Sequence, residues 1–165
     1  GRPGGGGADA PHGGGRVTAG QWADYRALLE SLTRTLEDLT AVEQQKTAAV
    51  SCGDLEAVDA CMKREQVLSL SLRGADQKRE KLVRQMGLSG VPLRDLLGHC
   101  PQEEYFATQD VVVKLQGQYK IFQAASQVAR DTLECHLRAI EKIQKDYNGG
   151  EPLPEQPLRQ SDFLA

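Results

Sequence analysis

The strongest constraint on the fold is a long apolar series in the C-terminal third of the chain. From position 112 to position 147, residues spaced alternately three and four apart form one unbroken series, and nine of its 11 members are apolar or aromatic. No proline occurs between Pro101 and Pro152, and proline strongly disrupts helices. The spacing is that of one helix face, so it predicts a single helix over about 102–147. The series reads Val112, Leu115, Tyr119, Phe122, Ser126, Ala129, Leu133, His136, Ile140, Ile143 and Tyr147.

Two further helices are expected before it, over about 19–52 and 54–86. Thr18 and Gln21 have the spacing of a capping box, and Gly53 and Gly87 stand where a glycine ends a helix. Asp54 can cap the second helix, so the corner between the two predicts an antiparallel hairpin. The first helix carries the apolar series Trp22, Tyr25, Leu29, Leu32, Leu36 and Leu39, and the second a looser one of Leu55, Val58, Met62, Leu68, Leu72, Leu82 and Met86.

These elements predict an all-α fold. Residues 88–101 interrupt the pattern, and a short helix is expected over 92–98 with Pro92 at its first position. We therefore expect an elongated, coiled-coil-like antiparallel three-helix bundle over 18–148, with this short extra helix between the second and last long helices. Residues 1–17 form a Gly-rich leader, expected to be disordered and given no function, and residues 149–165 form a Pro-rich tail, expected to be flexible.

The lengths of the three helices do not match. The first two hold about 33 residues, roughly 50 Å each, and the last about 45 residues, close to 70 Å. The last helix should therefore extend about 20 Å past the corner near Gly53, and Ile140, Ile143 and Tyr147 lie in that extension. An apolar series without a covering helix should pair with a second copy or receive a partner. The alternative is that the leader or the tail folds back over it, or that the helix bounds differ by several residues.

The sequence carries no recognisable catalytic or metal motif. There is no Gly-rich phosphate loop after a strand, no H-E-x-x-H and no G-x-S-x-G, so we expect no enzyme, no cofactor and no metal site. A small helical enzyme would need a pocket that the pattern does not indicate. The formal net charge of −3 argues against nucleic acid or acidic lipid as a partner. No apolar run reaches the roughly 18 residues of a membrane span.

Cysteine usage indicates the compartment. The four cysteines are scattered without a C-x-x-C pair, which favours free thiols in a reducing cytoplasm. His99 adjoins Cys100 and His136 adjoins Cys135, but side chains one apart on a helix diverge by about 100° and cannot chelate a metal alone.

Several short segments, in a fixed order, suggest a family. They are residues 25–32 (YRALLESL), 52–58 (CGDLEAV), 63–65 (KRE), 86–88 (MGL) leading into 93–97 (LRDLL), and 145–150 (KDYNGG). Over about residues 22–150 the chain resembles the FlgN-like flagellar export chaperones. Val58 stands where that family more often has leucine, and the Gly-rich leader has no counterpart there.

The resemblance implies a cytoplasmic chaperone of flagellar type III export. Such a protein binds the C-terminal helical part of hook-associated (hook–filament junction) proteins through its own C-terminal region and delivers them to the export gate. It also implies that Tyr147 helps to dock the complex on the gate. We expect the partner to contact the last helix at Leu133, Leu137, Ile140, Ile143 and Tyr147, as an amphipathic segment would. The alternative is a self-associating structural coiled coil, and we expect a monomer or weak dimer.

Overall fold

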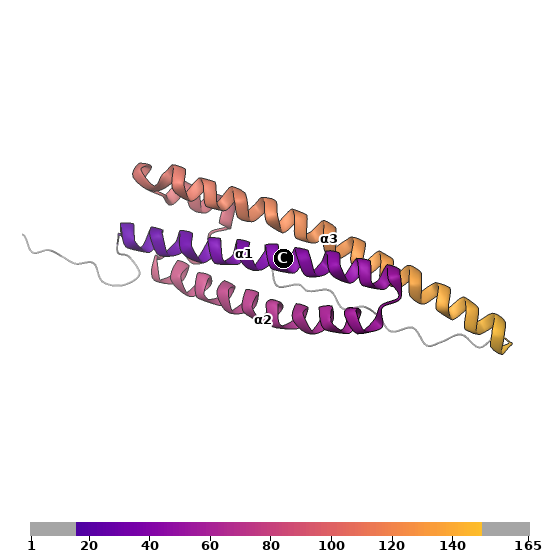
Figure 1. Ribbon diagram of the computed structural model, residues 1–165. Helices are drawn as coiled ribbons and strands as arrows, with labels where there is room; N and C mark the ends of the chain where they lie inside the picture. Colours follow the sequence, from indigo (N-terminus) through magenta and orange to yellow (C-terminus); the bar gives the residue numbers. More distant parts are fainter. Residues whose placement is uncertain (1–15, 150–165) are drawn as a thin grey trace, which may run out of the picture. The chain divides into compact units, whose positions relative to one another are not determined.

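A computed structural model describes residues 16–149 and confirms the all-α fold (Figure 1). Three long helices pack antiparallel, a short 3-10 helix lies between the second and the third, and no strand occurs among the described residues. The elements are α1 (Ala19–Cys52), α2 (Leu55–Gln85), η1 (Leu93–His99) and α3 (Gln102–Asn148). The expectations for the leader and the tail fall outside the described residues, apart from positions 16, 17 and 149.

The helix ends follow the capping residues of the sequence. At the start of α1, the Thr18 backbone N–H donates to the Gln21 side-chain carbonyl at 2.9 Å, and the Gln21 N–H donates to the Thr18 hydroxyl at 3.1 Å. This reciprocal pair is the predicted capping box.

The corner between α1 and α2 is built around one glycine. Gly53 has φ 72°, and its N–H donates to the Val50 carbonyl at 3.1 Å while the Asp54 N–H donates to the Ala49 carbonyl at 2.9 Å. These two bonds form a Schellman motif, which needs the left-handed backbone that glycine adopts without strain. The Asp54 carboxylate then accepts the Ala57 N–H at 3.1 Å and caps α2.

The short element differs from the prediction in type and position. It is a 3-10 helix over Leu93–His99, with Pro92 preceding it as the cap rather than as its first residue. The Asp95 N–H donates to the Pro92 carbonyl at 2.9 Å and the Cys100 N–H to the Leu97 carbonyl at 3.2 Å. Both bonds span three residues, the tighter winding that short connecting segments commonly adopt.

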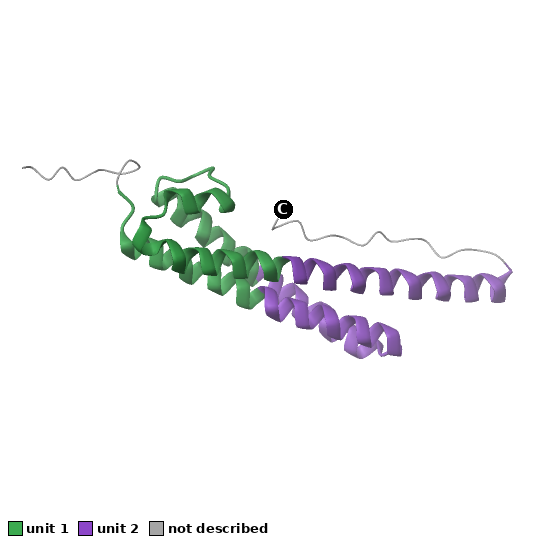
Figure 2. Ribbon diagram, turned by 90° about the horizontal axis from the view of Figure 1, so that it is seen from above, with its two compact units in different colours: residues 1–35, 71–119 green, residues 36–70, 120–165 purple. Residues whose placement is uncertain are grey.

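The described chain divides into two compact units (Figure 2). Unit 1 comprises residues 16–35 and 71–119, and unit 2 comprises residues 36–70 and 120–149. Within unit 1, every helix contributes fully or nearly fully buried apolar side chains. They are Trp22, Tyr25, Leu29 and Leu32 from α1, Leu72 and Val83 from α2, Leu96 from η1, and Val111, Val112 and Leu115 from α3, and Met86, directly after the end of α2, is buried as well.

Unit 2 has a thinner core. From α1 it buries Leu36, Leu39, Val42, Ala49 and Val50, whereas Cys61 of α2 and Ala129 of α3 are the only buried residues contributed by those helices among the described residues of unit 2. Figure 2 shows the last turns of α3 continuing past the corner that joins α1 to α2. The predicted length mismatch is therefore confirmed, with 47 residues in α3 against 34 in α1 and 31 in α2.

Candidate partner-binding surface

The apolar series of α3 loses its cover toward the C-terminal end. Ala129 is 1% exposed, Ile140 is 49%, Ile143 is 67% and Tyr147 is 89% exposed. No described residue of α3 after Ala129 is buried. The apolar spacing continues unchanged over the same turns, so the exposure results from the absence of a covering helix rather than from a change in sequence.

Four of the five residues predicted to bind a partner are exposed. Leu137, Ile140, Ile143 and Tyr147 are exposed, and Leu133 is half-buried. At about 100° per residue, all five lie within an arc of about 120° on α3. The structure thus brings them onto one face of one helix, and we refer to these five residues as the seam end.

The looser apolar series of α2 is only partly buried. Two of its members, Leu55 and Met62, are 79% and 51% exposed. They lie seven residues apart and share one side of the helix, about 100–120° from the side on which Cys61 and Leu72 are buried. The apolar residues of α2 therefore span two sides of the helix, and only one of these sides is buried.

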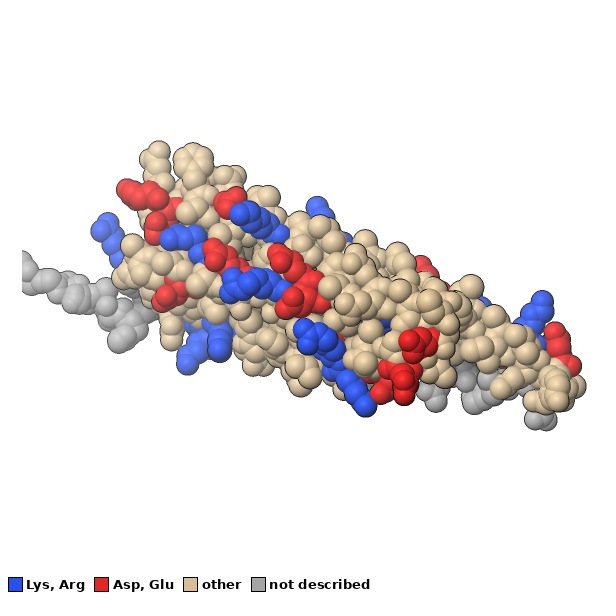
Figure 3. All heavy atoms as spheres, in the orientation of Figure 1, with Lys and Arg blue, Asp and Glu red and all other residues tan. Residues whose placement is uncertain are grey.

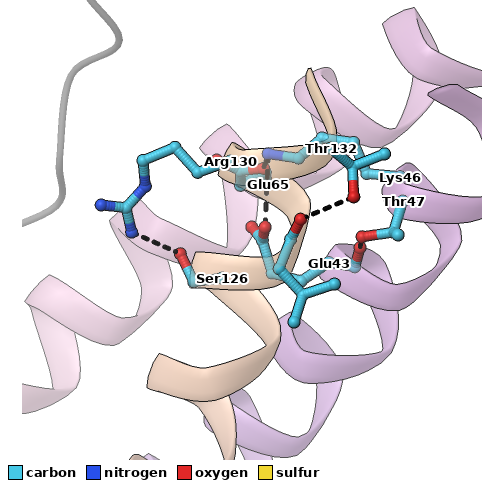
Figure 4. A network of polar contacts seen from close by, with 8 residues as sticks. Glu43, Lys46, Thr47, Glu65, Ser126, Arg130 and Thr132 are labelled. Carbon is cyan, nitrogen blue, oxygen red and sulfur yellow. Dashed lines mark hydrogen bonds and ion pairs between the residues drawn. The ribbon is translucent and has the colours of Figure 1, made fainter. Parts of the chain in front are cut away.

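A buried ionic cluster in unit 2 also went unpredicted (Figure 4). Lys46 of α1 contacts the Glu65 carboxylate of α2 at 2.6 Å and the Glu43 carboxylate at 3.3 Å. Glu43 is only 3% exposed. Figure 4 also shows a separate hydrogen bond within α3, in which Arg130 donates to the Ser126 hydroxyl at 3.3 Å. Glu43 follows Leu36 and Leu39 in the same series of residues spaced three and four apart. A charged residue at such a core position could have predicted this cluster from the sequence.

Burial and the neighbouring charges shift the pKa values of Glu43 and Lys46 in this cluster. Desolvation raises the pKa of Glu43 to about 7, the neighbouring Glu65 carboxyl acts in the same direction, and Lys46 opposes both. Burial alone would lower the pKa of Lys46, but the hydrogen bond to Glu65 and the two carboxylate charges outweigh it, so this pKa is raised. Lys46 therefore stays charged while Glu43 titrates near neutral pH.

Unit 1 holds a second polar cluster. Arg26 of α1 donates to the Thr108 hydroxyl at 3.2 Å and pairs with Glu104 at 3.5 Å, which ties α1 to the first turns of α3. The Cys100 thiol lies 3.6 Å from the same hydroxyl. Burial raises the pKa of Cys100, which disfavours the thiolate that nucleophilic chemistry requires.

Residues 16–149 contain neither a disulfide nor a cluster of potential metal ligands. The four cysteines are free, and no group of three or more His, Cys, Asp or Glu side chains in that range could hold a metal ion. Within the described helices, none is long and apolar enough to cross a membrane. On the face drawn in Figure 3, Lys and Arg are interspersed with Asp and Glu.

Comparison with known proteins yields no relative. No family model matches the chain, and no curated protein and no solved structure is significantly similar to it. The geometry of the seam end therefore carries the functional argument, and the family resemblance of the sequence adds to it as a prediction.

Proposed function

We propose that the chain is a non-enzymatic carrier that receives an amphipathic helix of a partner protein on the seam end of α3. The single observation that carries this proposal is the exposure of Leu137, Ile140, Ile143 and Tyr147 where α3 extends past the α1–α2 corner. Large exposed apolar side chains that adjoin one another in this way are typical of interaction sites. An amphipathic helix packed against them would bury its own apolar face and that of α3.

The family resemblance gives the partner its identity within this proposal. We propose a cytoplasmic chaperone of flagellar type III export, with hook-associated proteins as cargo and the export gate as destination. Cargo held on the seam end is prevented from self-association before secretion. Tyr147, the most exposed of the five residues and one position from the end of α3, contributes to docking on the gate.

The energetics suit a complex that must be taken apart. Burying about 600 Å² of apolar surface at about 25 cal/mol/Å² contributes roughly 15 kcal/mol gross. Much of this is offset by the ordering of the cargo and by lost translational freedom. The net affinity is therefore moderate, which allows release at the gate.

A double substitution tests the site. Ile140→Asp with Ile143→Asp should abolish binding of a purified hook-associated protein in a pull-down or calorimetric titration, with helix content by circular dichroism unchanged. Lys142→Asp is the matched control, because it alters the net charge by the same amount on the charged side of α3 and should leave binding intact. Normal cargo binding by the double variant would show that the site is elsewhere.

The exposed seam end also fits a second function, in which it pairs with a second copy in a structural coiled coil. Sedimentation over a wide concentration range separates the two. A dimer that persists at every concentration favours the structural role, whereas a monomer that binds a hook-associated protein favours the carrier.

A further inference from the structure

The charged residues of α3 are unevenly distributed around the seam end. Eight Lys, Arg, Asp and Glu residues lie between position 130 and the end of α3. At about 100° per residue, each can be placed by its angle from the nearer edge of the seam end, which is Leu137 on one side and Ile143 on the other. Three acids lie close to these edges, and three bases lie farther round the helix.

The three acids border the apolar face on both sides. Glu141 and Glu134 lie about 40° and 60° beyond Leu137, and Asp146 lies about 60° beyond Ile143. Asp146 is exposed, and the two glutamates are half-buried. Charged residues that flank a helix–helix contact in this way pair with charges of the facing helix. A helix packed on the seam end therefore has a carboxylate beside each of its edges.

These carboxylates are largely available to a partner. Glu134 has a loose contact with Arg138 at 3.7 Å, and exposed pairs of this kind contribute little. Within residues 16–149, no ion pair involves Glu141 or Asp146. The negative charge of the border is therefore not neutralised by the described part of the chain.

The bases of the same turns lie on the opposite side of α3. Lys145, Arg138 and Lys142 are exposed and lie about 80–100° beyond the nearer edge of the seam end. Asp131 lies about 120° beyond it, and its carboxylate accepts the Gln127 side-chain amide at 2.8 Å. Positive charge on these turns therefore points away from a helix that occupies the seam end.

One further base is close to the edge in angle but lies earlier along the helix. Arg130 is about 20° beyond Leu137 and seven residues before it, about 10 Å along the axis. The preceding residue, Ala129, is only 1% exposed. Arg130 itself is half-buried and donates to the Ser126 hydroxyl at 3.3 Å (Figure 4). Arg130 therefore borders the covered part of the apolar series rather than its exposed turns.

The α1–α2 corner of the same unit is also acidic. Asp54, Glu56 and Asp59 are exposed, and no base occurs between positions 53 and 62. The first base of α2 is Lys63, which pairs with Asp59 at 2.9 Å. The corner that α3 passes (Figure 2) therefore adds negative charge to this end of unit 2.

A second copy of the chain does not complement this border. In an antiparallel pair the edge formed by Glu134 and Glu141 faces the same edge of the other copy, and in a parallel pair it faces the edge formed by Asp146. Acids meet acids in both arrangements, and like charges across an interface disfavour binding. A helix with Lys or Arg along both edges of its apolar face meets a carboxylate on each side instead.

We propose that the seam end selects an amphipathic helix whose apolar face is bordered by Lys and Arg residues. This inference rests on the proposed carrier function, because it describes the partner of the same surface. Apolar contact provides most of the affinity, and the bordering acids determine which helices are accepted. They repel helices with acidic borders, including a second copy of α3.

Two synthetic helices test the border. Both are about 21 residues long with leucine at the core positions of each heptad, and they differ in carrying Lys or Glu at the flanking positions. In fluorescence anisotropy titrations with the full chain at pH 8 and low salt, the Lys helix should bind about tenfold more tightly than the Glu helix. Equal affinities, tighter binding of the Glu helix, or no binding of the Lys helix would each overturn the proposal.

Substitutions in the chain locate the effect. Ile140→Asp with Ile143→Asp should abolish binding of the Lys helix, and binding that persists in this variant would overturn the proposal. Glu134→Lys with Glu141→Lys should remove the preference for the Lys helix, with helix content by circular dichroism unchanged. An unchanged preference in that variant would show that the border acids do not select the partner.

A matched control separates the border from net charge. Asp38→Lys with Asp131→Lys changes the net charge by the same amount at exposed positions on α1 and on the opposite side of α3. The preference for the Lys helix should remain severalfold in this variant. Loss of the preference to the same extent as in the border variant would mean that net charge alone produces it, which would overturn the proposal.

This inference and the carrier function can fail separately. If a hook-associated protein binds at the seam end while the two synthetic helices bind equally well, the carrier function holds and selection by the border is wrong. If the border selects the Lys helix while no hook-associated protein binds, the selection holds and the identity of the cargo is wrong.

Discussion

Unit 1 and unit 2 are built from the same three helices, yet one has a continuous core and the other is open on one side. In unit 1, α3 buries Val111, Val112 and Leu115, and in unit 2 it buries Ala129 alone among the described residues. The apolar spacing of α3 is the same in both. The difference shows that an apolar face of α3 is exposed where its covering helices end. Under the proposed function, one end of this helix contributes to stability and the other to binding.

Matched leucine truncations should show the largest difference between the units. Leu29→Ala, at a fully buried position of unit 1, should lower the free energy of unfolding by about 3 kcal/mol because it leaves a cavity in a packed core. Leu137→Ala, at a site 48% exposed in unit 2, should cost less than about 1 kcal/mol. Urea denaturation of both variants checks this. Similar losses would mean that the seam end is as well packed as the core of unit 1.

The ionic cluster of unit 2 should make stability depend on pH. The pKa of Glu43 is about 7 in the folded chain, above its ordinary value of 4.5, so the folded state binds the extra proton between these values. The free energy of unfolding should therefore fall as pH rises from about 4.5 to 7.

Removing the Glu43 charge should flatten this dependence. Glu43→Gln should remove about 2.5 kcal/mol of the change between pH 5 and 8, because a pKa shift of one unit corresponds to about 1.4 kcal/mol and most of the shift of the Glu43 pKa from 4.5 to about 7 lies in this range. Glu37→Gln, at an exposed position of the same helix, is the control. An unchanged pH profile in the Glu43 variant would show that this carboxyl does not titrate in that range.

The smallest expected effects concern the helix caps, one in each unit. Thr18→Ala removes the acceptor of the Gln21 N–H, and Asp54→Ala removes the acceptor of the Ala57 N–H. Each should lower the free energy of unfolding by about 1 kcal/mol. Thermal denaturation followed by circular dichroism measures both. A loss above about 3 kcal/mol at Asp54 would mean that the corner does more than cap α2.

Much of this fold is readable from the sequence because helices carry local signals. The capping box at Thr18 and the glycines at 53 and 87 fix the ends of α1 and α2, and both glycines have positive φ as expected. All six members of the α1 series are buried. The exposure of Ile140, Ile143 and Tyr147 was also predictable, because it follows from the mismatch in helix length and the continuing apolar spacing of the last helix.

The remaining features depend on contacts that a single helix pattern does not encode. The exposure of Leu55 and Met62 reflects which side of α2 receives a neighbour, and periodicity shows only that an apolar side exists. The contact of Lys46 with Glu65 joins residues 19 apart on different helices. The 3-10 winding of η1 was not predicted, because a segment of seven residues is too short for apolar periodicity to distinguish a 3-10 helix from an α-helix.

Hydrogen exchange along α3 tests the central claim most directly. In the free chain, amides of residues 133–148 should exchange at least 100-fold faster than those of residues 108–118, corresponding to about 3 kcal/mol less protection against local opening. Addition of a hook-associated protein should then slow exchange at residues 133–147 and leave residues 108–118 unchanged. Equal protection of the two segments in the free chain, or no slowing at the seam end when that protein is added, would contradict the account.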